Sequence, residues 1–188
     1  SKTIVSQGNC SSSYAIAPVS VINDRWCKLS PADHPVLSPQ GPLACDKVIN
    51  KNCKEGFVSR TLDYAKIYGL SRTKTILTAH LLKLLNNARK LQKISKNSKY
   101  QIIVLPKTNK NQAKIINYGP VIAVIPVYRD FLIYKSGVYQ VYAGNQKFSS
   151  GHALKVIGWD VRDGKNCWLV ENSWGEDWGE NGIGYLFY

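Results

Sequence analysis

Apolar positions in the first half of the chain recur at helical spacing and predict three helices. The first is expected to follow Ser12, with Ser11 or Ser12 as its cap and a kink at Pro18 inside it. The second is expected over residues 57–68 and is ended by Gly69. The third is expected over residues 75–96, where leucines repeat every three or four positions. Residues 30–42 and 45–56 are rich in turn formers and are expected to be loops.

The second half has short apolar segments that predict strands. They cover residues 100–105, 121–128, 137–142, 152–159, 167–171 and 183–188, with turns such as Asp163-Gly164 between them. Helices followed by an antiparallel sheet predict an α+β fold of two lobes, and a cleft between such lobes is a natural ligand site. We expect the 188 residues to form a single domain, helical over about residues 1–99 and built from strands over about residues 100–188.

Positive charge is concentrated in one segment of the chain. The formal net charge is +13, and residues 64–129 contain 13 Lys and Arg but no Asp or Glu. The third predicted helix is basic and amphipathic, and its candidate polyanion-binding residues are Lys83, Arg89, Lys90, Lys93 and Lys96. Such a field attracts a glycosaminoglycan or an anionic membrane surface, the alternative being an ordinary solvated basic face. Nucleic acid is not an expected partner, because no stacking-aromatic motif accompanies the charge.

Composition narrows the class of protein further. No run of 18 apolar residues exists, so no transmembrane segment is expected. Five cysteines suggest an oxidising compartment, which favours a secreted, lysosomal or vacuolar protein, and we expect a monomer. The cysteines form no CxxC pair and the three histidines are scattered, so we expect neither a metal site nor a cofactor.

Three motifs carry candidate chemistry. Residues 7–15 read QGNCSSSYA, residues 149–153 read SSGHA, and residues 168–175 read WLVENSWG. A hydroxyl near the start, then a His, then an Asn is the order of a papain-type site. In that order and at that spacing, the motifs resemble those of the papain family of cysteine proteases, and the stretch DFLIYKSGVY at residues 130–139 resembles its cathepsin B branch. The resemblance covers nearly the whole chain and implies a papain-like fold with a peptide or protein segment bound between the lobes.

The resemblance also implies a role for each motif residue. Ser13 occupies the nucleophile position, His152 is the base, Asn172 orients that base, and Gln7 donates to an oxyanion. Residues expected at the peptide-binding cleft are Gly56, Glu55, Gly151 and Trp174. By the same resemblance Cys10 pairs with Cys53, whereas Cys27 and Cys45 either pair with each other or stay reduced, and Cys167 is a buried free thiol.

Ser13 stands where the family has its reactive cysteine, and this departure leaves three hypotheses. In the first, the chain is a proteolytically inactive homologue that acts by binding. In the second, it is a cysteine endopeptidase or exopeptidase whose nucleophile was mutated to Ser. In the third, Ser13, His152 and Asn172 form a hydrolase with a serine nucleophile.

Overall fold

The computed structural model describes residues 4–32, 34, 36–46, 49–73 and 110–188 of the chain. It contains two compact units, one made of residues 1–9 with 104–188 and the other of residues 10–103. The predicted helix over residues 75–96, with its five basic candidate residues, and the predicted strand over residues 100–105 lie outside the described residues. The described elements confirm the α+β class expected from the sequence.

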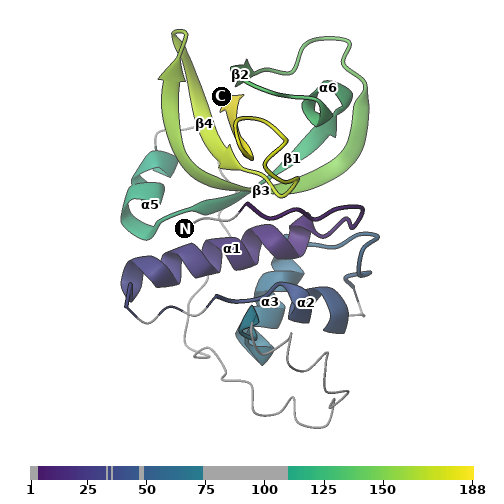
Figure 1. Ribbon diagram of the computed structural model, residues 1–188, viewed down its shortest axis with the longest axis vertical. Coiled ribbons are helices and arrows are strands. Elements are labelled where there is room, and N and C mark those ends of the chain that lie inside the picture. The colour runs from purple at the N-terminus through teal and green to yellow at the C-terminus, as the bar shows by residue number, and fades with distance from the viewer. Residues whose placement is uncertain (1–3, 33, 35, 47–48, 74–109) are drawn as a thin grey trace. The chain divides into compact units, whose positions relative to one another are not determined.

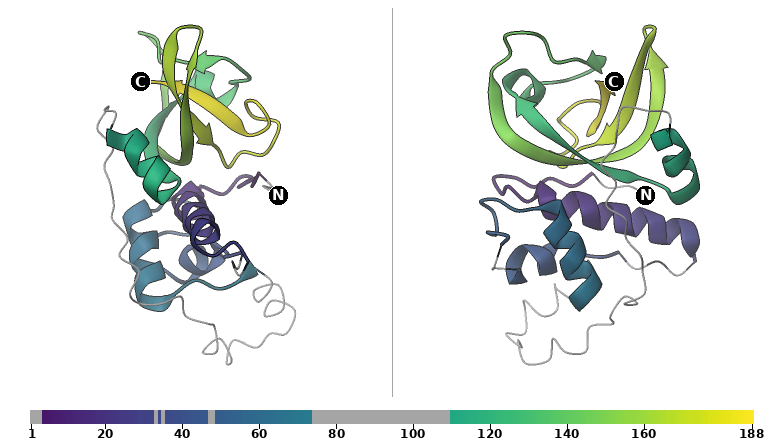
Figure 2. Two further views of the ribbon diagram at one scale, coloured as in Figure 1. Left: turned by 90° about the vertical axis from the view of Figure 1, so that its left-hand side faces the viewer. Right: turned by 180° about the vertical axis from the view of Figure 1, so that it is seen from behind.

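In the helical unit, α1 (Ser13–Leu29) packs with α2 (Gln40–Cys45) and α3 (Val58–Tyr68), as Figures 1 and 2 show. The predicted first helix is present and continues through the buried Pro18. Its buried face consists of Tyr14, Ala15, Ala17, Val19, Val21 and Ile22. Gly69, with a φ of 80°, ends α3 as expected, because this backbone conformation is open to glycine.

One local expectation for this unit is confirmed only in position, and a second is wrong. Ser12 occupies the N-cap position, but its hydroxyl donates to the Cys10 carbonyl at 3.3 Å and makes no capping bond to the helix. Residues 40–42 were expected in a loop, yet α2 begins at Gln40 with Pro42 in its first turn. Proline is tolerated there because the first amides of a helix have no intrahelical acceptor.

In the other unit, five strands form one curled sheet in the order β1-β3-β4-β5-β2 (Figure 1). Their bounds are β1 (Val121–Tyr128), β2 (Val138–Tyr139), β3 (Lys147–Arg162), β4 (Lys165–Glu171) and β5 (Ile183–Phe187). β1, β3, β4 and β5 pair antiparallel as expected, but β2 pairs parallel with β5. The unit also contains α5 (Lys110–Tyr118) and the short α6 (Arg129–Leu132), neither of which was predicted. Its core includes Phe131, Leu154, Val156, Val170 and Trp178.

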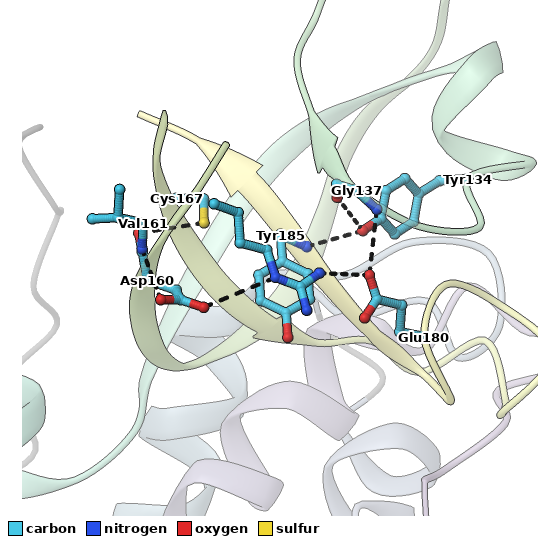
Figure 3. A network of polar contacts seen from close by, with 8 residues as sticks. Tyr134, Gly137, Asp160, Val161, Cys167, Glu180 and Tyr185 are labelled. Carbon is cyan, nitrogen blue, oxygen red and sulfur yellow. Dashed lines mark hydrogen bonds and ion pairs between the residues drawn. The ribbon is translucent and has the colours of Figure 1, made fainter. Parts of the chain in front are cut away.

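A network of polar contacts joins the β3–β4 hairpin to β5 and to the segment before β2 (Figure 3). The guanidinium of Arg162 lies 3.4 Å from the centre of the Tyr185 ring and donates to Glu180 at 2.7 Å. Glu180 also accepts the Gly137 amide at 3.3 Å. The Tyr134 hydroxyl donates to the Gly137 carbonyl at 2.6 Å and accepts the Tyr185 amide. The β3–β4 hairpin, β5 and the segment before β2 are therefore tied together.

No helix within the described part of the chain is long and apolar enough to cross a membrane.

Candidate active site

Ser13 is the first residue of α1 and is 8% exposed. The segment before it is fixed by the disulfide between Cys10 and Cys53, and the Ser11 amide donates to the Cys53 carbonyl at 2.9 Å. A helix N-terminus carries partial positive charge and favours a negatively charged group. The position therefore suits a nucleophile that becomes an anion, but a hydroxyl ionises far less readily than a thiol.

Tyr14 and Gly56 define the environment next to Ser13. The Tyr14 hydroxyl donates to the Asn52 carbonyl at 2.8 Å. A Cβ placed on Gly56 would lie 2.5 Å from the Tyr14 ring, so the ring requires glycine at this position. Glu55 is exposed and pairs with Lys51, and the hydrogen bond from Lys51 lowers the pKa of the Glu55 carboxyl. Gly56 thus has a packing role as well as the peptide-contacting role expected for it.

His152 on β3 and Asn172, which follows β4, are hydrogen-bonded. The His152 Nε2 and the Asn172 Oδ1 are 2.7 Å apart, and the two residues are only 5% and 3% exposed. The Ser173 backbone amide also donates to this Oδ1, at 2.8 Å. Because the Ser173 amide can only donate, it fixes the oxygen of the Asn172 side chain on that side. His152 must then carry its proton on Nε2 and keep Nδ1 as the basic nitrogen.

Trp174 covers the imidazole. The His152 and Trp174 ring centroids are 4.6 Å apart, and Trp174 is held by edge-on contacts with Phe131 and Trp178. Burial lowers the pKa of His152 below its ordinary value, with the Asn172 hydrogen bond acting in the opposite direction. A buried imidazole with a lowered pKa is neutral at pH 7 and can accept a proton.

Gln7 is attached to the same part of the sheet. Its backbone amide donates to the Ser173 carbonyl at 2.8 Å, and the Ser173 hydroxyl donates to the Gln7 Oε1 at 2.6 Å. Because Oε1 accepts this bond, the orientation of the Gln7 side-chain amide is defined, with Nε2 as its donating end. Ser173 belongs to the motif at residues 168–175, which predicts no role for its side chain. Nothing in the pattern revealed that its side chain positions Gln7.

The candidate residues fall into two groups. One unit contains Gln7, Gly151, His152, Asn172 and Trp174, and the other contains Ser13, Glu55, Gly56, Cys10 and Cys53. Gly151 lies beside Val124, whose Cγ1 would be 3.4 Å from a Cβ at this position. Among the described residues, no cluster of three or more His, Cys, Asp or Glu side chains could hold a metal ion.

The chain matches a family model described as "Papain family cysteine protease" over residues 2–187. It therefore belongs to the papain family. Two relatives from Caenorhabditis elegans resemble it over 97% of its length: "Cathepsin B-like cysteine proteinase 3" at 31% identity and "Gut-specific cysteine proteinase" at 32%. A solved structure, "proCathepsin B S9 from Trypanosoma congolense", matches 99% of the chain with a TM-score of 0.76 and 25% identity.

These matches define the chain more closely as a cathepsin B-like protein with the papain fold. The chain covers 56% and 62% of the lengths of the two nematode relatives and 66% of the trypanosome chain. The papain-like fold expected from the motifs is confirmed.

Proposed function

We propose that this cathepsin B-like chain binds a peptide or protein segment at a papain-type groove and has little or no proteolytic activity. The observation that carries the proposal is the hydroxyl of Ser13 at the head of α1, where the family motif has a reactive thiol. A papain-type thiol forms an ion pair with its histidine, which a hydroxyl cannot do at neutral pH. Burial lowers the pKa of His152, so its imidazole is neutral at pH 7 and is not part of such an ion pair.

The peptide-binding part of the proposal rests on the oriented side chains of the unit that contains the sheet. Gln7 is oriented by Ser173, His152 by Asn172, and Trp174 covers the imidazole. Losing the nucleophile of such a site removes most of the catalysis but leaves substrate binding and the oxyanion contacts in place. We assign Gly56 and Gly151 to contacts with the peptide backbone and Glu55 to the rim of the groove.

A peptidase assay on unfolded protein and on small peptides tests this proposal. We expect binding of peptides without robust cleavage, and binding should weaken in a Gly151→Trp variant that obstructs the groove. A Lys165→Ala change on the β3–β4 hairpin serves as a matched surface control. Robust cleavage by the unaltered chain that is lost in His152→Ala would overturn the proposal.

A second function, a hydrolase with a serine nucleophile, is favoured by one specific observation. His152 has its basic nitrogen at Nδ1 and a lowered pKa, which is the state in which a histidine acts as general base for a hydroxyl. In this function Ser13 attacks a carbonyl carbon, His152 accepts the hydroxyl proton, and an acyl-enzyme forms as the leaving group departs. A burst of product from an activated ester, abolished in Ser13→Ala, is the expected signature.

Polyanion binding is proposed as an accompanying property. It rests on the net charge of +13 and on the absence of Asp and Glu from residues 64–129. We expect retention on heparin that weakens steeply with salt, as electrostatic binding does. Neutralising Lys83, Arg89, Lys90, Lys93 and Lys96 together should shift elution to lower salt, and unchanged elution of that variant would exclude the assignment. Co-sedimentation with anionic vesicles tests the alternative that the partner is a membrane surface. We propose that the protein is a monomer and that it is secreted or lysosomal.

A further inference from the structure

A buried ion pair lies beside the His152–Asn172 pair. The Lys155 Nζ and the Glu171 Oε1 are 2.7 Å apart, and the two side chains are 4% and 12% exposed. The residues are directly opposite each other on β3 and β4. Removing both charges from water opposes their attraction, so such a pair is weak evidence for stability, whereas losing one partner is strongly destabilising. The position of the pair in the ladder therefore needs another explanation.

On β1 and β5, the residues that flank the pair in this row are apolar, and Glu180 follows beyond Ile183 through an isolated bridge. Lys155 is opposite Ile122 on β1, and Glu171 is opposite Ile183 on β5. The row thus runs from an apolar residue through the ion pair to another apolar residue. Within this row, Glu171 is the acidic residue that Lys155 faces, and a change of register would separate the two charges.

The register of β3 against β4 changes just before the pair. From the Asp163-Gly164 turn, the ladder runs regularly from Arg162 opposite Lys165 to Gly158 opposite Leu169. Continued without interruption, it would place Val156 opposite Glu171 and Lys155 opposite Asn172. Instead, Ile157 is an extra residue on β3, so that Val156 is opposite Val170 and Lys155 is opposite Glu171. This is a β-bulge of one residue.

The bulge determines on which face of the sheet Asn172 lies. Directly opposed residues share a face, and a shift of one residue moves a side chain to the other face. Continued past Glu171, the observed register puts Asn172 opposite Leu154, on the face that His152 shares. The uninterrupted register would put Asn172 opposite Lys155, on the face away from His152. The 2.7 Å bond between His152 and Asn172 therefore requires the bulge.

Hydrophobic patterning alone distinguishes the two registers weakly. The four residues of β4 before Glu171 are Cys167, Trp168, Leu169 and Val170, so both faces of the strand are apolar there. Glu171 differs because the uninterrupted register would turn its carboxylate toward the core with Val156, which is 2% exposed. It would also leave the Lys155 ammonium opposite Asn172. Both displacements are unfavourable for buried charges.

We propose that Lys155 and Glu171 are positioning residues whose ion pair selects the bulged register and thereby places Asn172 beside His152. This rests on the proposed function only in assigning importance to the His152–Asn172 pair. The two charges act on the site through the strands and do not contact the reacting atoms.

NMR on the full chain tests the proposal with three double variants. Lys155→Met/Glu171→Met removes both charges, Lys155→Glu/Glu171→Lys exchanges them, and Lys51→Met/Glu55→Met is a matched control on the exposed Lys51–Glu55 pair. Cross-strand contacts from residue 155 to residue 171 or 172 report the register. The Nε2–H resonance of His152, assigned with His152→Gln, reports the tautomer, which a merely structural role would not change.

We expect the charge exchange and the control to keep the 155–171 contacts and the Nε2–H resonance. The apolar variant should populate the uninterrupted register at roughly 10% or more and lose Nε2–H intensity in proportion. A folded apolar variant with the bulged register alone and an unchanged His152 resonance would overturn the proposal. A folded charge-exchanged variant that loses the 155–171 contacts would also overturn the proposal. This second criterion applies even if the apolar variant does not fold. Neither readout depends on peptide binding or cleavage, so failure of the proposed function leaves this test intact.

Discussion

At the scale of single residues, His152 combines deep burial with a fixed tautomer. Asn172 and Ser173 together place its proton on Nε2, and Trp174 excludes water from one face of the ring. The motifs were sufficient to predict that His152 and Asn172 belong together. They could not predict the role of the Ser173 hydroxyl, because it depends on the direction of the side chain. They could not predict the Lys155–Glu171 pair either, because it depends on a β-bulge that has no signal in the residue pattern.

The lowered pKa of His152 should make stability depend on pH. The unfolded chain binds a proton at His152 near pH 6.5, whereas the folded chain binds it at lower pH, so the unfolded state holds more protons between these values. The contribution to stability is complete above pH 6.5 and is lost as the pH falls toward the folded pKa. Urea unfolding between pH 5 and pH 8 should show a smaller decrease for His152→Gln than for the unaltered chain. Equal decreases would show that His152 is not buried in its neutral form.

Ser173→Ala should disturb the orientation of Gln7, the proposed oxyanion donor, without removing its side chain. In a Ser13→Cys background, Gln7→Ala is expected to slow reaction with a peptide ester by roughly 10²–10³-fold, the usual effect of losing one oxyanion-hole donor. Ser173→Ala removes the hydroxyl that holds the Gln7 Oε1 and should give a smaller loss. Ser20→Ala on α1 is the control, because it also replaces a serine hydroxyl by hydrogen but does not alter the Ser173–Gln7 hydrogen bond. A Ser173→Ala rate equal to that of the parent would show that Gln7 is positioned without this hydroxyl.

At the scale of elements, the sequence predicted the helices and strands whose signals lie within their own residues. β1 and α3 lie within a residue of their predicted bounds, because the apolar run 121–128 and the glycine after Tyr68 are local signals. α2 and α5 were missed, since Gly41-Pro42 and a polar stretch after residue 109 resemble loops. β3 is longer than predicted and β2 is parallel to β5, because both features depend on pairing between distant segments.

Gly56→Ala tests the packing that holds the start of α1. The new methyl would lie 2.5 Å from the Tyr14 ring, and overpacking of this kind destabilises by about 1–3 kcal/mol. Gly158→Ala is the control, since its Cβ would be no closer than 3.8 Å to any neighbour. The free energy of unfolding of Gly56→Ala, measured by chemical denaturation, should be well below that of Gly158→Ala. Similar values for the two variants would contradict the close approach of Tyr14 to Gly56.

At the scale of the whole molecule, this papain-family chain has a histidine–asparagine pair and an oriented glutamine in one unit, and a serine at the start of α1 after a disulfide-linked segment in the other. The family was predictable because its motifs are spread over both halves of the chain. The consequence of Ser13 follows from chemistry: the fold can present a hydroxyl, but it cannot give that hydroxyl the acidity of a thiol.

The disulfide between Cys10 and Cys53 should contribute to global stability. It closes a loop with a sequence separation of 43, for which the chain-entropy description gives about 4 kcal/mol. Cys10→Ser/Cys53→Ser should lower the free energy of unfolding by an amount of this order under non-reducing conditions. Cys27→Ser, which alters a cysteine outside the disulfide, is the control. Equal stability of the double variant and the parent would show that the cross-link contributes nothing to the folded state.

Covalent labelling of Ser13→Cys with a peptide epoxide, mapped by mass spectrometry, tests most directly whether Ser13, His152 and Asn172 form one papain-type site. We predict rapid modification of the introduced thiol, loss of that reaction in Ser13→Cys/His152→Ala, and no labelling at residue 13 of the unaltered chain. An introduced thiol that reacts equally fast without His152, or does not react at all in a folded Ser13→Cys protein, would contradict it.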